Sequence, residues 1–98
     1  MIVVRDIFQI EPDQMKLAKE LAKQSRQIED RLGHRTARIL TDCVGEYYTL
    51  ITESEFDSLA EYETAIKAVI ADPEWQQFYP QFRRLMRSGR REIFTILE

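Results

Sequence analysis

Four aromatic side chains spaced along one stretch of the chain are the residues best suited to hold a flat molecule. Trp75, Phe78, Tyr79 and Phe82 recur at helical spacing, so they lie on one side of a helix. The plainer interpretation is core packing, because aromatics at this spacing are what a helix packed on a sheet needs. The alternative is a pocket wall for a flat apolar ligand, oriented by the Trp75 N–H or the Tyr79 O–H.

Arg5 is the second candidate for chemistry, because it falls within an apolar stretch that predicts a β-strand. An arginine on a partly buried sheet needs an anionic partner. Asp6, Glu46 or Glu92 could supply that partner, within the chain or across a dimer. The alternative is a clamp on the carboxylate or phenolate of a bound molecule.

Tyr47 and Tyr48 are neighbours in a predicted strand, so one of them should face a cavity. A tyrosine in that place can hydrogen-bond a ligand oxygen, although tyrosine is also a common strand residue. We predict that a small, largely apolar ligand is contacted by Arg5, Gln9, Tyr47, Trp75 and Tyr79.

His34 and Cys43 are the only residues of their types, and they make a poor ligand set for a metal. A Cys–His nucleophile pair would need the two side chains in contact and a third group to orient them. We expect both residues to be loop spacers. Since no phosphate or nucleotide motif occurs either, we predict no metal and no cofactor.

The length and the net charge of the chain limit the number of domains and the kinds of partner that it can have. The chain has 98 residues and a net charge of −3, which predicts one domain over residues 1–98 and disfavours nucleic acid and anionic membranes as partners. The five arginines between 83 and 91 suit the end of a helix, with docking onto the acidic stretch 53–63 as the alternative. No apolar run approaches a membrane span and the start MIVVRDIF is no signal peptide, so a cytoplasmic location is expected.

Turn and cap signals predict the elements that must position these residues. Gly33 suits a left-handed helix end, and Ser58 with Glu61 forms a capping box. Asp72 is a good helix cap and Pro73 interrupts the preceding helix. In chain order we expect a strand over 2–10, a helix from Pro12 to Gly33, strands over 36–41 and 46–52 joined by a turn at 42–45, helices starting at Ser58 and at Asp72-Pro73, and a strand over 90–97 released by Gly89.

The order β-α-β-β-α-α-β predicts an α+β, ferredoxin-like fold, in which a four-stranded antiparallel sheet carries helices on one face only. The set predicted to face the helices is Val4, Phe8, Ile10, Tyr48, Leu50, Phe94 and Ile96. The complementary set is Arg5, Ile7, Gln9, Tyr47, Thr49, Ile51, Ile93 and Thr95. Because that second face mixes apolar and polar side chains, we expect a second copy to cover it by sheet-on-sheet packing; a solvated face is the alternative.

The whole chain resembles the dimeric α+β barrel superfamily, and within it the NIPSNAP-like and antibiotic-biosynthesis-monooxygenase-like proteins. The stretches that carry the resemblance are Val3-Val4-Arg5-Asp6-Ile7-Phe8-Gln9-Ile10-Glu11-Pro12, Asp72-Pro73-Glu74-Trp75-Gln76-Gln77-Phe78-Tyr79 and residues 86–97. The resemblance implies a homodimer with a cavity between sheet and helices, and a function that varies among relatives.

Some relatives of this kind are cofactor-independent monooxygenases of polyketide-like aromatics and others degrade haem. The haem-degrading branch uses an asparagine, a tryptophan and a histidine together. This chain has no asparagine, and His34 follows the helix stop at Gly33, so haem degradation is not expected. The leading hypothesis is a homodimer that binds a small apolar ligand, and the alternatives are such a monooxygenase and a non-enzymatic interaction domain.

Overall fold

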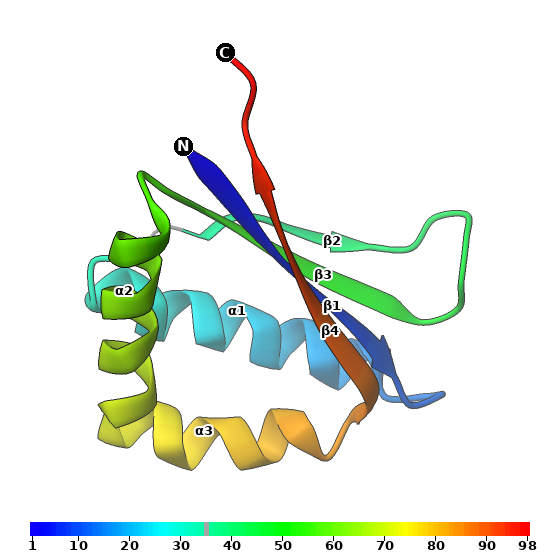
Figure 1. Cartoon of the computed structure of the whole chain (residues 1–98). Helices are drawn as coiled ribbons and strands as arrows, with labels where there is room; N and C mark the ends of the chain where they lie inside the picture. Colours follow the sequence, from blue (N-terminus) through cyan, green and yellow to red (C-terminus); the bar gives the residue numbers. More distant parts are fainter. Residues whose placement is uncertain (35) are drawn as a thin grey trace.

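The computed structural model describes residues 1–34 and 36–98 and confirms the predicted element order. The elements are β1 (Ile2–Ile10), α1 (Met15–Arg31), β2 (Thr36–Thr41), β3 (Thr49–Phe56), α2 (Leu59–Ala71), α3 (Pro73–Arg83) and β4 (Met86–Thr95) (Figure 1). The strands form one antiparallel sheet in the order β2-β3-β1-β4. This is the ferredoxin-like α+β arrangement, with β1 and β3 in the middle of the sheet.

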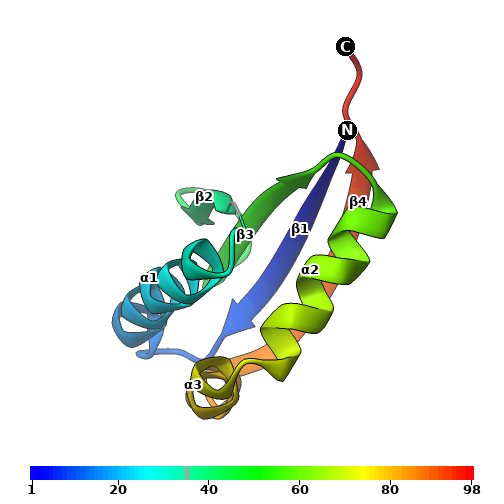
Figure 2. The same cartoon turned by 90° about the vertical axis from the view of Figure 1, so that its left-hand side faces the viewer.

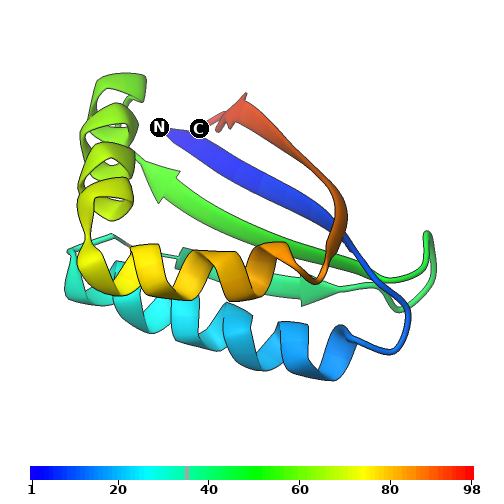
Figure 3. The ribbon, with the colours of Figure 1, turned by 90° about the horizontal axis from the view of Figure 1, so that it is seen from below.

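The helices cover one face of this sheet. Helices α1 and α3 lie side by side beneath the strands (Figure 3). Helix α1 lies toward the β2 edge and α2 toward the β4 edge (Figure 2). Among the described residues, no helix covers the opposite face, which we call the outer face.

The helix ends form where their cap residues predict. The Ser58 side chain accepts a hydrogen bond from the Glu61 N–H at 3.2 Å, and the Asp72 carboxylate accepts one from the Trp75 N–H at 3.0 Å. Gly33 has a φ of +80°, the left-handed conformation that glycine adopts without strain. Arg31, in the last turn of α1, also donates to Asp72 at 2.8 Å, which ties the end of α1 to the start of α3.

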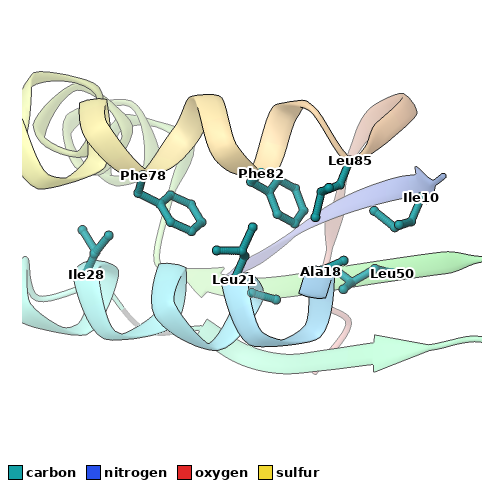
Figure 4. Close-up of a cluster of buried hydrophobic side chains, with 9 residues drawn as sticks. Ile10, Ala18, Leu21, Ile28, Leu50, Phe78, Phe82 and Leu85 are labelled. Carbon is teal, nitrogen blue, oxygen red and sulfur yellow. The ribbon is translucent and has the colours of Figure 1, made fainter. Parts of the chain in front are cut away.

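The main hydrophobic core lies between α1, α3 and the sheet (Figure 4). Phe78 and Phe82 are almost fully buried in it, and the edge of one ring of the Phe8–Phe82 pair meets the face of the other at a centroid distance of 5.1 Å. The buried members of this cluster are Ile10, Ala18, Leu21, Ala22, Ile28, Leu50, Phe78, Phe82 and Leu85. Phe78 and Phe82 therefore pack in the core, and both also line the cavity that lies between the sheet and the helices.

The structure corrects the predicted boundaries of α1 and β3. Helix α1 begins at Met15, because Asp13 adopts a φ of +70° and turns the chain after Pro12. Strand β3 begins at Thr49 rather than at residue 46, because Thr49 bonds back to the loop through Asp42 and Glu46. The same strand runs to Phe56, four residues beyond its predicted end at residue 52.

Strand β4 begins at Met86 and contains Gly89, which the sequence placed just before the strand. A Cβ atom at Gly89 would lie 3.2 Å from Cδ1 of Phe8, so the Phe8 ring occupies the space of the missing side chain. The glycine therefore allows close packing inside the strand and does not end a turn.

The strand register corrects the two predicted faces. Val4, Phe8, Ile10 and Leu50 face the helices as predicted, whereas Phe94 pairs with Val3 on the outer face. The positions predicted for the outer face that turn toward the helices are Ile93 and Thr95, which pair with Val4 and Ile2. The two remaining members of the set predicted to face the helices lie outside the strands: Ile96 follows the end of β4, and Tyr48 lies in the β2–β3 loop. A shift of one residue reverses every side chain of a strand, and the sequence pattern of β4 does not exclude that shift.

Candidate functional site

A cavity of about 120 Å³ lies between the inner face of the sheet and the helices. All the described helices and the strands β1, β3 and β4 contribute to its lining. An engineered apolar cavity of about 150 Å³ in another protein binds benzene, so this space matches a molecule built around one aromatic ring.

Two groups of aromatic rings line the cavity. From α3, Trp75 and Tyr79 stack with a centroid distance of 5.9 Å and an interplanar angle of 20°. From β3 and α2, Phe56 and Tyr62 meet edge to face at 5.3 Å. Flat walls of this kind favour a planar ligand, because aromatic rings stack or meet edge to face at these distances.

Three hydrogen-bonded polar side chains, each from a different element, lie among the aromatic residues of the lining. Nε of Arg91 on β4 donates to Asp6 on β1 at 2.5 Å, and its Nη1 donates to the Tyr62 hydroxyl on α2. The Arg91 side chain is 46% exposed, so this group lies where the cavity reaches solvent. We call these three residues the polar triad.

Electrostatics keep the polar triad charged at Arg91 and neutral at Tyr62. Burial raises the pKa of Tyr62 above its ordinary value of 10.0, against the opposing effect of the Arg91 charge. Burial lowers the pKa of Arg91, but the hydrogen bond and negative charge of Asp6 raise it by more, so the net shift is upward. At neutral pH the Tyr62 hydroxyl therefore carries its proton beside a guanidinium cation.

His34 also lines the cavity, although the sequence predicted a loop spacer. Its side chain is 7% exposed and stacks at a tilt on Phe56, with 4.8 Å between the ring centroids. Nδ1 lies 3.3 Å from the Glu29 carboxylate, outside good hydrogen-bond geometry, and neither ring nitrogen has a hydrogen-bond partner among the described residues.

The signal that could have located His34 is the Gly33 helix end. The Gly33 N–H bonds to the Asp30 carbonyl and the His34 N–H to the Glu29 carbonyl, which is the Schellman pattern. In that motif the residue after the glycine packs back against the last turn of the helix. His34 occupies that position, so the motif favours burial of the His34 side chain.

The structure brings two of the five predicted ligand contacts to this cavity. Trp75 and Tyr79 line it, as described above. Arg5 and Gln9 lie on the outer face, where Gln9 accepts a hydrogen bond from Thr49 at 3.1 Å, and Tyr47 is 79% exposed in the β2–β3 loop. A ligand role for these last three residues stays a prediction and would need a site outside the cavity.

The anionic partner of Arg5 is Glu53, which was not among the candidates predicted for it. Nε of Arg5 donates to Glu53 at 2.7 Å, and Arg38 donates to the other carboxylate oxygen at 2.9 and 2.5 Å. Burial of the carboxylate raises its pKa, but the hydrogen bonds from Arg38 and Arg5 lower it by more, so the pKa of Glu53 lies below its ordinary value of 4.5. Glu53 is only 2% exposed, although none of the described helices covers its face of the sheet.

Two absences hold for the described part of the chain. It contains no group of three or more His, Cys, Asp or Glu side chains arranged to hold a metal ion. No helix in it combines the length and the apolar character needed to cross a membrane.

Comparison with known proteins identifies the family and supports the fold. The NIPSNAP family model matches residues 5–98. No curated protein sequence matches the chain. A NIPSNAP family protein from Agrobacterium tumefaciens superposes with a TM-score of 0.92 at 19% identity, over 99% of this chain and 93% of the other. An uncharacterized NIPSNAP domain protein from Burkholderia xenovorans gives 0.91 at 15% identity, over 99% and 95% of the two chains.

The fold is also similar to that of an enzyme, at a lower TM-score. SnoaB, a cofactor-independent oxygenase from Streptomyces nogalater, superposes with a TM-score of 0.75 at 11% identity, over 99% of this chain and 93% of the other. At these low identities the structural similarities establish a common fold and leave the activity open.

Proposed function

Because the chain belongs to the NIPSNAP family, we propose that it is a homodimeric protein that binds a small, largely apolar aromatic molecule in the cavity between its sheet and helices. The observation that carries the proposal is the lining of that cavity. Stacked rings from α3 and edge-to-face rings from β3 and α2 enclose a space of about 120 Å³.

Ser54→Phe should abolish binding of toluene, a probe that consists of one apolar ring. Ser54 lies on β3 and lines the cavity, so a phenyl group at this position fills the space that the probe would take. Trp75 is the only tryptophan and also lines the cavity, so its indole N–H gives a single NMR signal that reports occupancy. Saturable movement of that signal in the wild type, and none in Ser54→Phe, is the expected result.

Thr64→Phe is the control, because it adds the same ring on the exposed side of α2. It should bind toluene as the wild type does. If the wild-type signal does not respond, or if the two variants respond alike, the cavity is not the binding site.

The homodimer is proposed from the outer face. The register places Arg38, Glu53, Arg5 and Glu92 next to one another across the four strands, a row of alternating charge that we call the charged row. Beside it runs the apolar row, which consists of Leu40, Ile51 and Ile7. A two-fold axis brings a surface against its own copy, where alternating charges can meet opposite charges and apolar rows can meet each other.

A second candidate function is cofactor-independent oxygenation of an aromatic substrate. The fold shared with SnoaB and the position of Arg91 in the cavity wall support it. Such chemistry needs a group that stabilises a substrate anion while molecular oxygen reacts with it, and a guanidinium can do so.

Oxygen uptake with one-ring and fused-ring phenols separates these functions. An oxygenase should consume oxygen in proportion to added phenol, and Arg91→Gln should reduce that rate strongly while Arg83→Gln, on the exposed side of α3, should not. Binding of toluene without oxygen uptake from any phenol would leave the binding function alone.

A further inference from the structure

The polar triad presents hydrogen-bond donors to the cavity. A tyrosine hydroxyl has one proton to donate and two lone pairs to accept, whereas a guanidinium can only donate. Arg91 donates to the Tyr62 oxygen, so it uses one of the Tyr62 lone pairs and leaves the hydroxyl proton for another partner. Among the described residues, the hydrogen bonds of Tyr62 include no acceptor for that proton.

The cation beside Tyr62 also strengthens this donor. The guanidinium carbon of Arg91 lies 5.7 Å from the centroid of the Tyr62 ring, and Nη1 contacts its oxygen directly. A hydroxyl that accepts from a cation is polarised and donates more strongly, because hydrogen bonds in a chain reinforce one another. The group that suits the remaining proton is an oxygen acceptor on the ligand.

The charges around the cavity favour a neutral acceptor over an anionic one. The Asp6 carboxylate accepts a hydrogen bond from Nε of Arg91 at 2.5 Å, so it compensates the charge of Arg91 within the polar triad. Glu29 is a further acidic residue of the lining. The lining therefore carries the carboxylates of Asp6 and Glu29 beside the single guanidinium of Arg91, and this excess of carboxylates opposes the entry of a ligand carboxylate.

We propose that Tyr62 is the specificity residue of the cavity and that the ligand is a neutral aromatic carbonyl compound, whose oxygen accepts the Tyr62 O–H while its ring lies against the aromatic walls. Arg91 acts through Tyr62 as a positioning residue, and Asp6 holds Arg91 in place. This inference rests on the proposed binding function and names the ligand class for the same site.

Acetophenone and α-methylstyrene test the inference, because they differ only by the exchange of C=O for C=CH₂. Titrations that follow the Trp75 indole signal should show that the wild type binds acetophenone about tenfold more tightly, which is the effect expected from one hydrogen bond to a strong donor. Tyr62→Phe keeps the buried ring and removes the hydroxyl, so its two dissociation constants should be equal. Benzoate should bind the wild type more weakly than acetophenone does.

Tyr48→Phe is the control, because it removes the hydroxyl of a tyrosine in the β2–β3 loop, away from the cavity lining. It should keep the wild-type preference for acetophenone. Equal binding of the two probes to the wild type, an unchanged preference in Tyr62→Phe, or an equal loss in Tyr48→Phe would overturn the inference and leave ligand binding intact. If neither probe binds the wild type, the binding function fails and the inference fails with it.

Discussion

Phe94→Glu should convert the proposed dimer into a monomer. Phe94 is 44% exposed on the outer face and lies beside Arg5, whose guanidinium carbon is 5.2 Å from the centroid of its ring. Completing the burial of such a ring contributes about 1–2 kcal/mol, and in a two-fold interface each copy contributes it once. The two copies together lose about 2–4 kcal/mol, which weakens association about 30-fold to about 700-fold, since about 1.4 kcal/mol corresponds to a factor of ten.

The added carboxylates increase this effect, because each must lose its water to enter the interface. Analytical ultracentrifugation over a range of protein concentrations measures the dimer dissociation constant directly. Leu17→Glu is the control, because Leu17 on α1 has the same exposed fraction of 44% but lies away from the outer face. A wild type that sediments only as a monomer at micromolar concentration, or two variants that weaken association equally, would refute the interface.

Glu53→Gln should lower the free energy of unfolding by about 1.5–3 kcal/mol, the contribution typical of hydrogen bonds to a charged group. The substitution keeps the shape of the side chain, so it creates no cavity. It removes the charge that Arg5 and Arg38 share, and it replaces an acceptor oxygen with an amide group that can only donate. Because Glu53 is buried, solvent cannot replace the lost hydrogen bonds.

The pH dependence of this effect has a definite sign. The pKa of Glu53 is lowered in the folded chain, so its contribution is fully present above the ordinary value of 4.5 and is lost as the pH falls through the folded value. The difference in stability between wild type and Glu53→Gln should therefore be constant above 4.5 and shrink in acid. Urea unfolding at several pH values and one protein concentration measures it.

Glu55→Gln is the matched control, since Glu55 lies on the same strand and the same face but is exposed. It should cost little stability at any pH. If the two variants were equally stable, or if the difference between Glu53→Gln and wild type grew in acid, the charged row would not stabilise the sheet in the way that its geometry indicates.

The charged row and the polar triad place charges on opposite faces of one sheet with different roles. On the outer face, both carboxylate oxygens of Glu53 pair with arginines of neighbouring strands, so this charge stabilises the sheet. Arg91 on the inner face keeps a tyrosine oriented in a cavity wall. The first arrangement therefore serves the sheet and the proposed interface, and the second serves the ligand.

The order of the elements could be predicted from the amino-acid sequence, because the signals that set it are local. Gly33 can adopt the left-handed conformation, and Ser58 and Asp72 carry oxygens that accept the first N–H groups of a helix. Each of these effects depends on a few neighbouring residues, so the sequence predicts them without knowledge of the fold. The aromatic row on α3 is local in the same way, which is why Trp75 and Tyr79 could be assigned to a cavity wall.

The contacts between residues of different elements could not be predicted in the same way, because they depend on how the whole chain packs. Arg5 donates a hydrogen bond to Glu53, which lies 48 positions away in the sequence, and Arg91 donates one to Tyr62, which lies 29 positions away. Both pairings depend on strand register and on the path of α2 toward β4. A strand pattern with a period of two fits two registers that place opposite side chains in the core, and only the packing of all the elements together selects one of them.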